Sequence, residues 1–256
     1  MNILHSDGLK IAETTLYAHL SKSIKGSTVY GFVFAMNRGK PHTLEVLVDT
    51  WPAFTTIIVR PDPNVRKKTK GLYDEVLRRM LAVEDAIDWS TYFLIGGMTS
   101  FFPPKKYYII SMNYVVFVQY DFNFNKKPRL SVLNESHANV VNKTWKFGGD
   151  DKGYRNILNL IRHFPTCCIT DENNQPVSWV LLYDYCAMGM LYTQPEHRGK
   201  GYAKALVTTM AQRLHSQGYP VYCFIEECNP LSYKLFKSMF FSVDPSYRVV
   251  WYEFIC

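Results

Sequence analysis

The sequence predicts a mixed α/β fold in two halves, and three observations support this class. Segments with helical spacing of apolar residues alternate with segments of strand character along the chain. A length of 256 residues, with 47% apolar and 20% charged residues, suits a globular protein of one large or two small domains. The polar stretch 123–128, closed by a proline, reads as a linker, which predicts domains at 1–127 and 128–256.

The first half is predicted to begin with a helix over 6–24, where apolar residues recur at helical intervals. Segments 28–37 and 43–50 then alternate like strands. Because the turn-like sequence Arg-Gly-Lys-Pro joins them at 38–41, the three segments together predict a β-hairpin. The rest of this half is expected to contain a strand at 53–61 and an amphipathic helix at 71–87.

The second half has a clearer pattern, in which 186–193 is apolar on both faces, as is typical of a strand inside a sheet. An apolar stripe from Ala203 to Leu214 predicts a helix that ends near Gly218. The expected order is a strand at 130–134, helices at 136–147 and 154–164, strands at 166–171, 177–184 and 186–193, the helix after 203, a strand at 220–227, a helix at 229–240 and a strand at 247–255.

Charge and hydropathy narrow the classes of partner. The net charge of +7 and a pI near 9.0 permit a polyanionic ligand, either nucleic acid or a phosphorylated cofactor. The longest apolar run, 107–122, is interrupted by polar residues and is too short to span a bilayer, so we expect no membrane span. Short basic clusters at 65–70, 103–106 and 125–128 fall in predicted loops, where solvated linkers explain them better than nucleic-acid binding does.

The six cysteines show no Cys-x-x-Cys pair and no nearby histidine at zinc spacing, so no metal site is expected. Adjacent Cys167 and Cys168 point to opposite faces if extended, which suits reduced, buried thiols in a reducing compartment. Cys223 and Cys228 also admit a covalent acyl-enzyme, but without a histidine nearby in sequence buried thiols are preferred.

A glycine-rich segment, "PEHRGKGYAKAL" at 195–206, lies where a predicted strand ends and a helix begins. The first N–H groups of a helix lack intrahelical partners and attract anions, and Gly199 and Gly201 leave that backbone uncovered. Arg198 and Lys200 add positive charge. The alternative is an ordinary tight turn with solvated basic residues. The segment matches neither the GK[ST] of a P-loop nor GxGxxG, which argues against nucleoside triphosphates and dinucleotides.

In this context "RGKGYA" resembles the Q/R-x-x-G-x-G/A pattern of the GCN5-related N-acetyltransferase superfamily. The segments "VYGFVFAMNRGKP", "VDTWPAF", "VNKTWKFGG", "FPTCC" and "PVSWVLL" resemble, in order, those of the glycine N-acyltransferase family. The resemblance implies a mixed central sheet flanked by helices, as in the GCN5-related enzymes, with an N-terminal α/β half packed against it. Residues 99–125 depart from the family, which has helical sequence there.

The resemblance further implies an acyl-CoA:amino acid N-acyltransferase with acyl-CoA as cosubstrate and no permanently bound cofactor. Backbone of the preceding strand would pair with the pantetheine arm, as an added strand does, and Asn229 would lie beside that arm, a role compatible with capping a helix. The implied pyrophosphate cradle is Arg198, Gly199, Lys200, Gly201, Tyr202 and Ala203, and the implied pantetheine strand is Leu191, Tyr192 and Thr193.

Direct transfer needs a neutral amine, and an α-ammonium with a pKa of roughly 8 is mostly protonated at neutral pH, so a base helps. The family's glutamate base aligns with Ala187, which cannot take a proton. Glu226 and Glu227, at the end of the neighbouring strand, are the candidate substitutes, and two solvated carboxylates are the alternative. Asp184 is assigned to a hairpin turn.

Two further positions bear on the chemistry. His197 is assigned a polar contact in the glycine loop. The tyrosine that protonates the leaving thiolate in many superfamily members aligns with Phe236, so that acid is missing, but a thiolate can leave unaided.

Three functions therefore remain open. The first is transfer of an acyl group to a small amine, such as glycine or another amino acid. The second is an acyl-CoA-binding paralogue that has lost efficient chemistry, and the third is a nucleic-acid-binding module. The resemblance implies a mitochondrial location, with the cytoplasm as alternative because the N-terminus shows no arginine-rich presequence.

Overall fold

The computed structural model describes residues 2–20, 27–62, 64, 95–98, 102–111 and 128–253. The chain divides into two compact units: unit 1 comprises residues 1–107 and 245–256, and unit 2 comprises residues 108–244. The predicted linker at 123–128 lies outside the described residues except for Pro128, so the boundary at 127/128 stays a prediction. The predicted helix at 71–87 also lies outside them.

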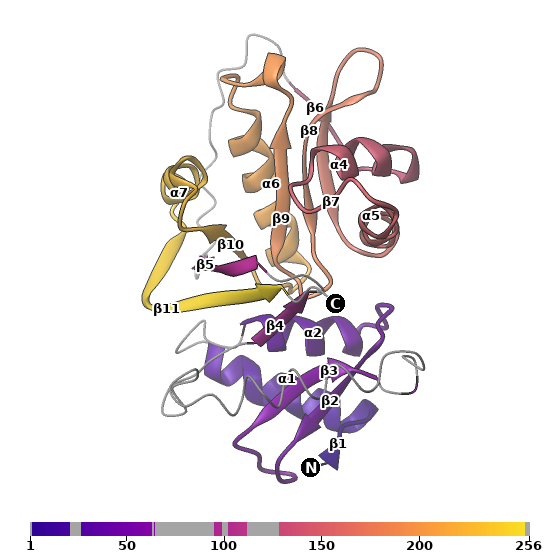
Figure 1. Ribbon diagram of the computed structural model, residues 1–256, viewed down its shortest axis with the longest axis vertical. Coiled ribbons are helices and arrows are strands. Elements are labelled where there is room, and N and C mark those ends of the chain that lie inside the picture. The colour runs from indigo at the N-terminus through magenta and orange to yellow at the C-terminus, as the bar shows by residue number, and fades with distance from the viewer. Residues whose placement is uncertain are drawn as a thin grey trace. The chain divides into compact units, whose positions relative to one another are not determined.

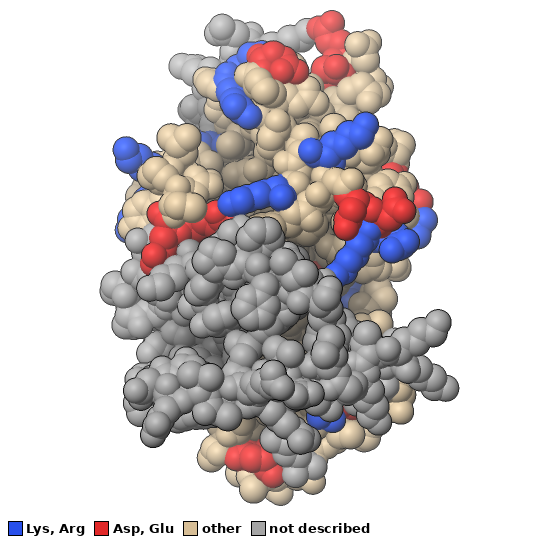
Figure 2. All heavy atoms as spheres, viewed as in Figure 1, with Lys and Arg blue, Asp and Glu red and all other residues tan. Residues whose placement is uncertain are grey.

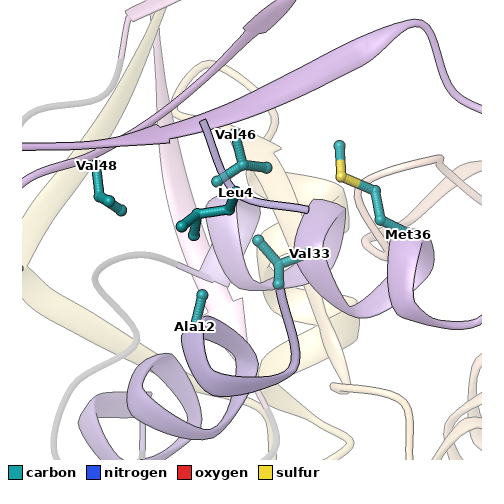
Figure 3. Packing of buried hydrophobic residues seen from close by; sticks show 6 residues of the cluster. All are labelled: Leu4, Ala12, Val33, Met36, Val46 and Val48. Atoms are coloured by element: carbon teal, nitrogen blue, oxygen red, sulfur yellow. The ribbon is translucent and has the colours of Figure 1, made fainter. Parts of the chain in front are cut away.

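Unit 1 begins with two helices and an antiparallel sheet whose strand order is β1-β2-β3. The elements are β1 (Asn2–Ile3), α1 (Ser6–Leu20), α2 (Ser27–Asn37), β2 (Leu44–Val48) and β3 (Ile57–Pro61). Figure 3 shows the core between them, to which both helices and the sheet contribute. Its buried residues are Leu4, Ala12, Val33, Met36, Val46 and Val48.

The predicted hairpin over 28–50 is wrong in its first strand, because 28–37 lies in helix α2. Eight of the eleven residues of α2 are buried, and a helix buried nearly all round lacks the one-sided periodicity that separates helix from strand. The segment expected as the hairpin turn instead ends this helix. Gly39 has a φ of 65°, its N–H donates to Met36 O, and Lys40 N–H donates to Ala35 O, which together form a Schellman cap.

Residues 95–111 contribute strands whose pairing is partly described. β4 (Ile95–Met98) pairs in parallel with β11 (Ser242–Glu253), from Ile95 opposite Val250 to Met98 opposite Glu253. β5 (Phe102–Ser111) occupies part of the region that departs from the family's helical sequence.

Unit 2 has the predicted order of helices and strands, and its sheet runs β6-β7-β8-β9-β10. The first three neighbouring pairs are antiparallel, and β9 and β10 are parallel. The elements are β6 (Arg129–Ser131), η1 (Glu135–His137), α4 (Ala138–Thr144), α5 (Asp151–His163), β7 (Thr166–Thr170), β8 (Pro176–Leu182), β9 (Met188–Thr193), η2 (Pro195–His197), α6 (Tyr202–Ser216), β10 (Tyr222–Glu226) and α7 (Pro230–Lys237).

The core of unit 2 forms around β8, which is buried at all seven positions. A strand buried on both faces needs cover on both sides. Helices α5 and α6 both pack against β8, and Figure 1 shows them on opposite sides of it. The predicted apolar stripe of α6 is confirmed, with Leu206, Met210 and Leu214 fully buried.

The surface and the helices give two further observations. Figure 2 shows basic and acidic side chains interspersed over the visible described face of unit 2, without the stripe of one sign that would follow a nucleic-acid backbone. Within the described ranges, none of the helices has the length and apolar character needed to cross a membrane.

Candidate active site

The strands β9 and β10 lie side by side only at the start of β9. Their register has one pair, Cys223 opposite Met188. On its other side β9 pairs with β8 through to Thr193, but the register shifts between Trp179 and Leu181, and Met190 has a φ of 51°. Such a bulge bends a strand and increases its twist. Beyond Met188, β9 therefore has an edge that β10 does not cover.

At the end of β9, successive residues direct their backbone N–H and C=O groups toward opposite edges of the strand. The Tyr192 carbonyl accepts from Ser178 Oγ at 2.9 Å, and Gln194 N–H donates to Val177 O, so these two residues face β8. Because backbone groups alternate along a strand, Leu191 and Thr193 face the opposite edge, which β10 does not cover. Leu191 can therefore pair with an extended amide, and Thr193 can do so through its N–H, since its carbonyl accepts from Arg198 Nε. Tyr192 stacks on Trp179 at 5.2 Å between ring centroids.

The glycine loop leads from this edge into α6. Gly199 and Gly201 have φ values of 75° and 77°, which is the left-handed region that side chains disfavour. Gly201 is the N-cap of α6 and supplies no side-chain hydrogen bond to its first turn. Because Gly199, Lys200 and Gly201 are exposed, the N–H groups of this turn are accessible to an anion.

Arg198 is held against the end of β9. Its Nε donates to Thr193 O at 3.1 Å, and its guanidinium carbon lies 5.8 Å from the centroid of the Tyr192 ring. His197 packs by stacking on Tyr202 at 6.3 Å. Its Nδ1 is buried and has no hydrogen-bond partner among the described residues, so this atom does not make the predicted polar contact.

Helix α7 begins at the same edge of the sheet. β9 and β10 are parallel, so their carboxyl ends, and the loops that follow them, lie at one edge. Asn229 caps α7, with its Oδ1 accepting from Ser232 N–H at 3.1 Å. This confirms the predicted cap and brings Asn229 to the edge where the glycine loop lies.

The two candidate carboxylates differ sharply in environment. Glu226 ends β10, and its side chain is only 14% exposed. Both of its oxygens accept from Lys146 Nζ, at 2.7 and 3.0 Å, and Cys228 Sγ lies 3.3 Å from Oε2. Glu227 lies beyond the strand and is exposed. The alternative of two solvated carboxylates is therefore wrong for Glu226.

Aromatic side chains surround the start of β9. A Cβ at Gly189 would lie 2.0 Å from the ring of Tyr183, so only glycine allows this ring to cover the strand. Tyr183 stacks on Tyr185 at 5.0 Å, and Tyr185 lies 6.0 Å from Phe224 of β10. Burial raises the pKa of the Tyr183 hydroxyl, which also hydrogen-bonds Trp145. Tyr183 is therefore neutral at physiological pH.

The position of the missing family glutamate is enclosed. Ala187 is fully buried, and its carbonyl accepts from Tyr183 N–H at 2.9 Å in the turn between β8 and β9. Asp184 lies in this turn, as predicted, and burial raises the pKa of its carboxyl. The position that aligns with the family's glutamate is thus a buried alanine without an ionisable group.

The thiols in the described part of unit 2 are free, and four of them are buried as predicted. Burial raises the pKa of Cys167 to about 11 and that of Cys168 to about 12, and it also raises the pKa of Cys223. These thiols are poor nucleophiles because the thiolate is the reactive form. The expectation that Cys228 is a buried thiol is wrong, since it is exposed. No metal-binding cluster occurs among the described residues.

Lys146 is the site residue that sequence reasoning missed. It follows α4 and is separated from Glu226 by 80 positions. No motif connects the two residues, so no signal in the sequence could have found the pair.

The fold and this site define a mixed α/β protein of the GCN5-related N-acetyltransferase class. A family model described as aralkyl acyl-CoA:amino acid N-acyltransferase matches residues 1–105 and 110–165, and a model described as FR47-like protein matches residues 168–250. Because the first model covers more than half of the chain, the protein belongs to the aralkyl acyl-CoA:amino acid N-acyltransferase family.

The names of similar curated proteins support this family assignment. The chain is 26% identical over 294 residues to a mouse glycine N-acyltransferase-like protein, covering 98% of both chains. It is 28% identical over 272 residues to bovine glycine N-acyltransferase, covering 90% of this chain and 91% of the relative. The solved X-ray structure of a Drosophila protein shares the fold, with a TM-score of 0.60, 13% identity and 95% coverage of both chains. The resemblance predicted from the sequence is confirmed.

Proposed function

We propose that the protein transfers an acyl group from acyl-CoA to a small amine, such as glycine or another amino acid, by direct attack of the amine on the thioester. The observation that carries this proposal is the edge of β9 that β10 leaves open, between the glycine loop and Glu226. The names of the relatives, glycine N-acyltransferase and glycine N-phenylacetyltransferase, support the choice of acceptor.

In this proposal the acyl-CoA lies along one edge of the sheet. The pyrophosphate binds the N-terminus of α6, where Gly201 leaves the backbone accessible and Arg198 and Lys200 supply charge. The pantetheine amides pair with the backbone of Leu191 and Thr193 as an added strand. Asn229 at the start of α7 lies beside that arm.

Glu226 acts as the base, because it is a largely enclosed carboxylate at the end of β10. Its oxygen takes a proton from the acceptor ammonium, and the neutral nitrogen forms a bond to the thioester carbon. The carbon–sulfur bond then breaks, and the electron pair leaves with the CoA thiolate. The attacking nitrogen gives up its second proton to this thiolate, which leaves the amide and CoA thiol as products. Phe236 is buried and has no proton to donate. A thiol with a pKa of about 8.5 is a good enough leaving group without an acid.

A second function is favoured by one observation. Ala187 is fully buried at the position of the family's glutamate, so the protein would bind acyl-CoA yet turn over slowly. Glu226 distinguishes the two functions, since a competent base there makes the missing glutamate unimportant.

The test is thiol release by the purified protein with acetyl-, octanoyl- and benzoyl-CoA and a panel of amines, preceded by thermal shift with each acyl-CoA. We expect stabilisation by acyl-CoA and amine-dependent release of CoA. Stabilisation without release by any amine would establish the weakened paralogue instead. The absence of both would contradict the family-based proposal.

A further inference from the structure

Lys146 places a positive charge directly on the proposed base. Its Nζ contacts both carboxylate oxygens of Glu226, at 2.7 and 3.0 Å. The lysine side chain is 58% exposed, whereas that of the glutamate is 14% exposed. The cation is therefore reachable from solvent, while its partner is held in place at the end of β10.

We propose that this ion pair is the docking site of the acceptor zwitterion: Lys146 binds the carboxylate of the amino acid, and Glu226 binds its ammonium group. This inference rests on the proposed function, because it assigns the acceptor site of that reaction. It makes Lys146 the residue that selects amino acids over amines that lack a carboxylate.

The charges of the pair complement those of an amino acid. An α-amino acid carries its ammonium and its carboxylate one carbon apart. When it binds, the ion pair between Lys146 and Glu226 is replaced by two contacts, one from each residue to the amino acid. The exchange leaves neither charge of the pair without a partner, because the ligand supplies an opposite charge to each residue. An amine without the carboxylate would break the pair and leave Lys146 uncompensated.

Other described basic groups of unit 2 have different contacts or proposed roles. Arg198 and Lys200 belong to the glycine loop, which is proposed to bind the phosphates. Arg162 pairs with Glu135 at 2.7 Å, and Arg213 donates to the Thr166 carbonyl at 3.2 Å. Lys146, by contrast, contacts the proposed base itself.

Docking would also prepare the proton transfer. While the acceptor is absent, Lys146 neutralises the Glu226 carboxylate. When Lys146 moves to the acceptor's carboxylate, a Glu226 oxygen that it contacted faces the ammonium group and accepts its proton. The ring of Phe147 lies 5.8 Å from Lys146 Nζ, and Trp145 packs against Phe147 at 5.8 Å.

The experiment compares glycine with glycinamide, whose carboxylate is replaced by a neutral amide, using the best acyl-CoA of the panel. Lys146→Met removes the charge at similar length, and Lys146→Arg keeps it. Lys143→Met is the matched control, since Lys143 is exposed on α4. Charge-assisted hydrogen bonds of this kind predict a rise of roughly 10- to 100-fold in KM for glycine in Lys146→Met, with less than about 3-fold for glycinamide and for acyl-CoA.

Arginine at position 146 should preserve the preference for glycine, and Lys143→Met should leave it unchanged. Equal losses with glycine and glycinamide in Lys146→Met, or no loss with either, would overturn the proposal. If the parent releases no CoA with any amine, the proposed activity has failed, but titration of glycine into CoA-saturated protein still decides the docking. Glycine binding that Lys146→Met abolishes supports it, and no glycine binding to the parent overturns it.

Discussion

At the scale of single residues, two adjacent glutamates have the same side chain but different surroundings. Glu226 is the last residue of β10, paired with Lys146 and largely enclosed. Glu227 lies one residue further and is exposed. A base must be held near the reacting nitrogen to act, so only the first has the environment that positioned catalysis requires.

We therefore expect Glu226→Gln to lower kcat by about 10²- to 10⁴-fold, the usual contribution of a positioned base. Glutamine keeps the size of the side chain but cannot take a proton. The residual turnover of this variant should rise with pH, because it then depends on the neutral fraction of the amine. Steady-state kinetics between pH 6 and 9 measure this, with Glu227→Gln as the control. Unchanged turnover in both variants would refute the assignment of the base.

A second prediction concerns the position of the missing family glutamate. Ala187→Glu should destabilise the protein, because the larger, charged side chain would enter a fully buried position. Overpacking alone typically costs about 1–3 kcal/mol, and burial of the charge adds to it. Thermal unfolding should show a lower Tm and no gain in turnover. An unchanged Tm with faster turnover would instead mean that the glutamate reaches the acceptor.

At the scale of elements, α6 fixes the position of the glycine loop relative to the sheet. Its buried stripe packs on β7, β8 and β9, so its N-terminus stays at the carboxyl edge of β9. Glycines in the left-handed region occur at both ends of this helix, with φ values of 77° at Gly201 and 73° at Gly218. The two positions share the backbone geometry but differ in their proposed role.

Valine at each of these glycines separates backbone strain from ligand binding. Left-handed backbone costs an L-residue roughly 1–2 kcal/mol, so Gly201→Val and Gly218→Val should lose comparable stability. Only Gly201→Val should weaken acyl-CoA binding, by about tenfold or more, because its side chain would cover the N–H groups that hold the phosphates. Calorimetric titration with CoA measures this. Equal affinity in the two variants would show that the loop does not bind the phosphates.

At the scale of the whole molecule, the two units share the last strand. β11 begins in residues of unit 2 and ends in residues of unit 1, where it pairs with β4. A cut at the predicted linker would remove β4 and leave residues 250–253 without their parallel partner. The second half is therefore not self-contained in its strand pairing.

A fragment of residues 128–256 should consequently be less stable than the full chain and have reduced amine-dependent activity. Circular dichroism during heating would show the lower stability, and the thiol-release assay would show the lost turnover. A fragment that folds and works as well as the full protein would mean that the first half contributes nothing to the site.

Much of unit 2 could be predicted from the sequence because its signals are local. The apolar stripe of α6, the capping residue Asn229 and the glycines of the loop each act within a few positions, and the structure confirms the elements that they define. Helix and strand periodicities differ enough to separate these segments without knowledge of their neighbours.

Only the tertiary structure decided the remainder, because contacts between distant residues determined it. Residues 28–37 form a helix since the core of unit 1 buries them on nearly every side, and burial of this kind erases the pattern that separates helix from strand. Lys146 and Glu226 meet across 80 positions. Their charges can pair only after α4 and β10 have packed into one fold, and no local pattern encodes that packing.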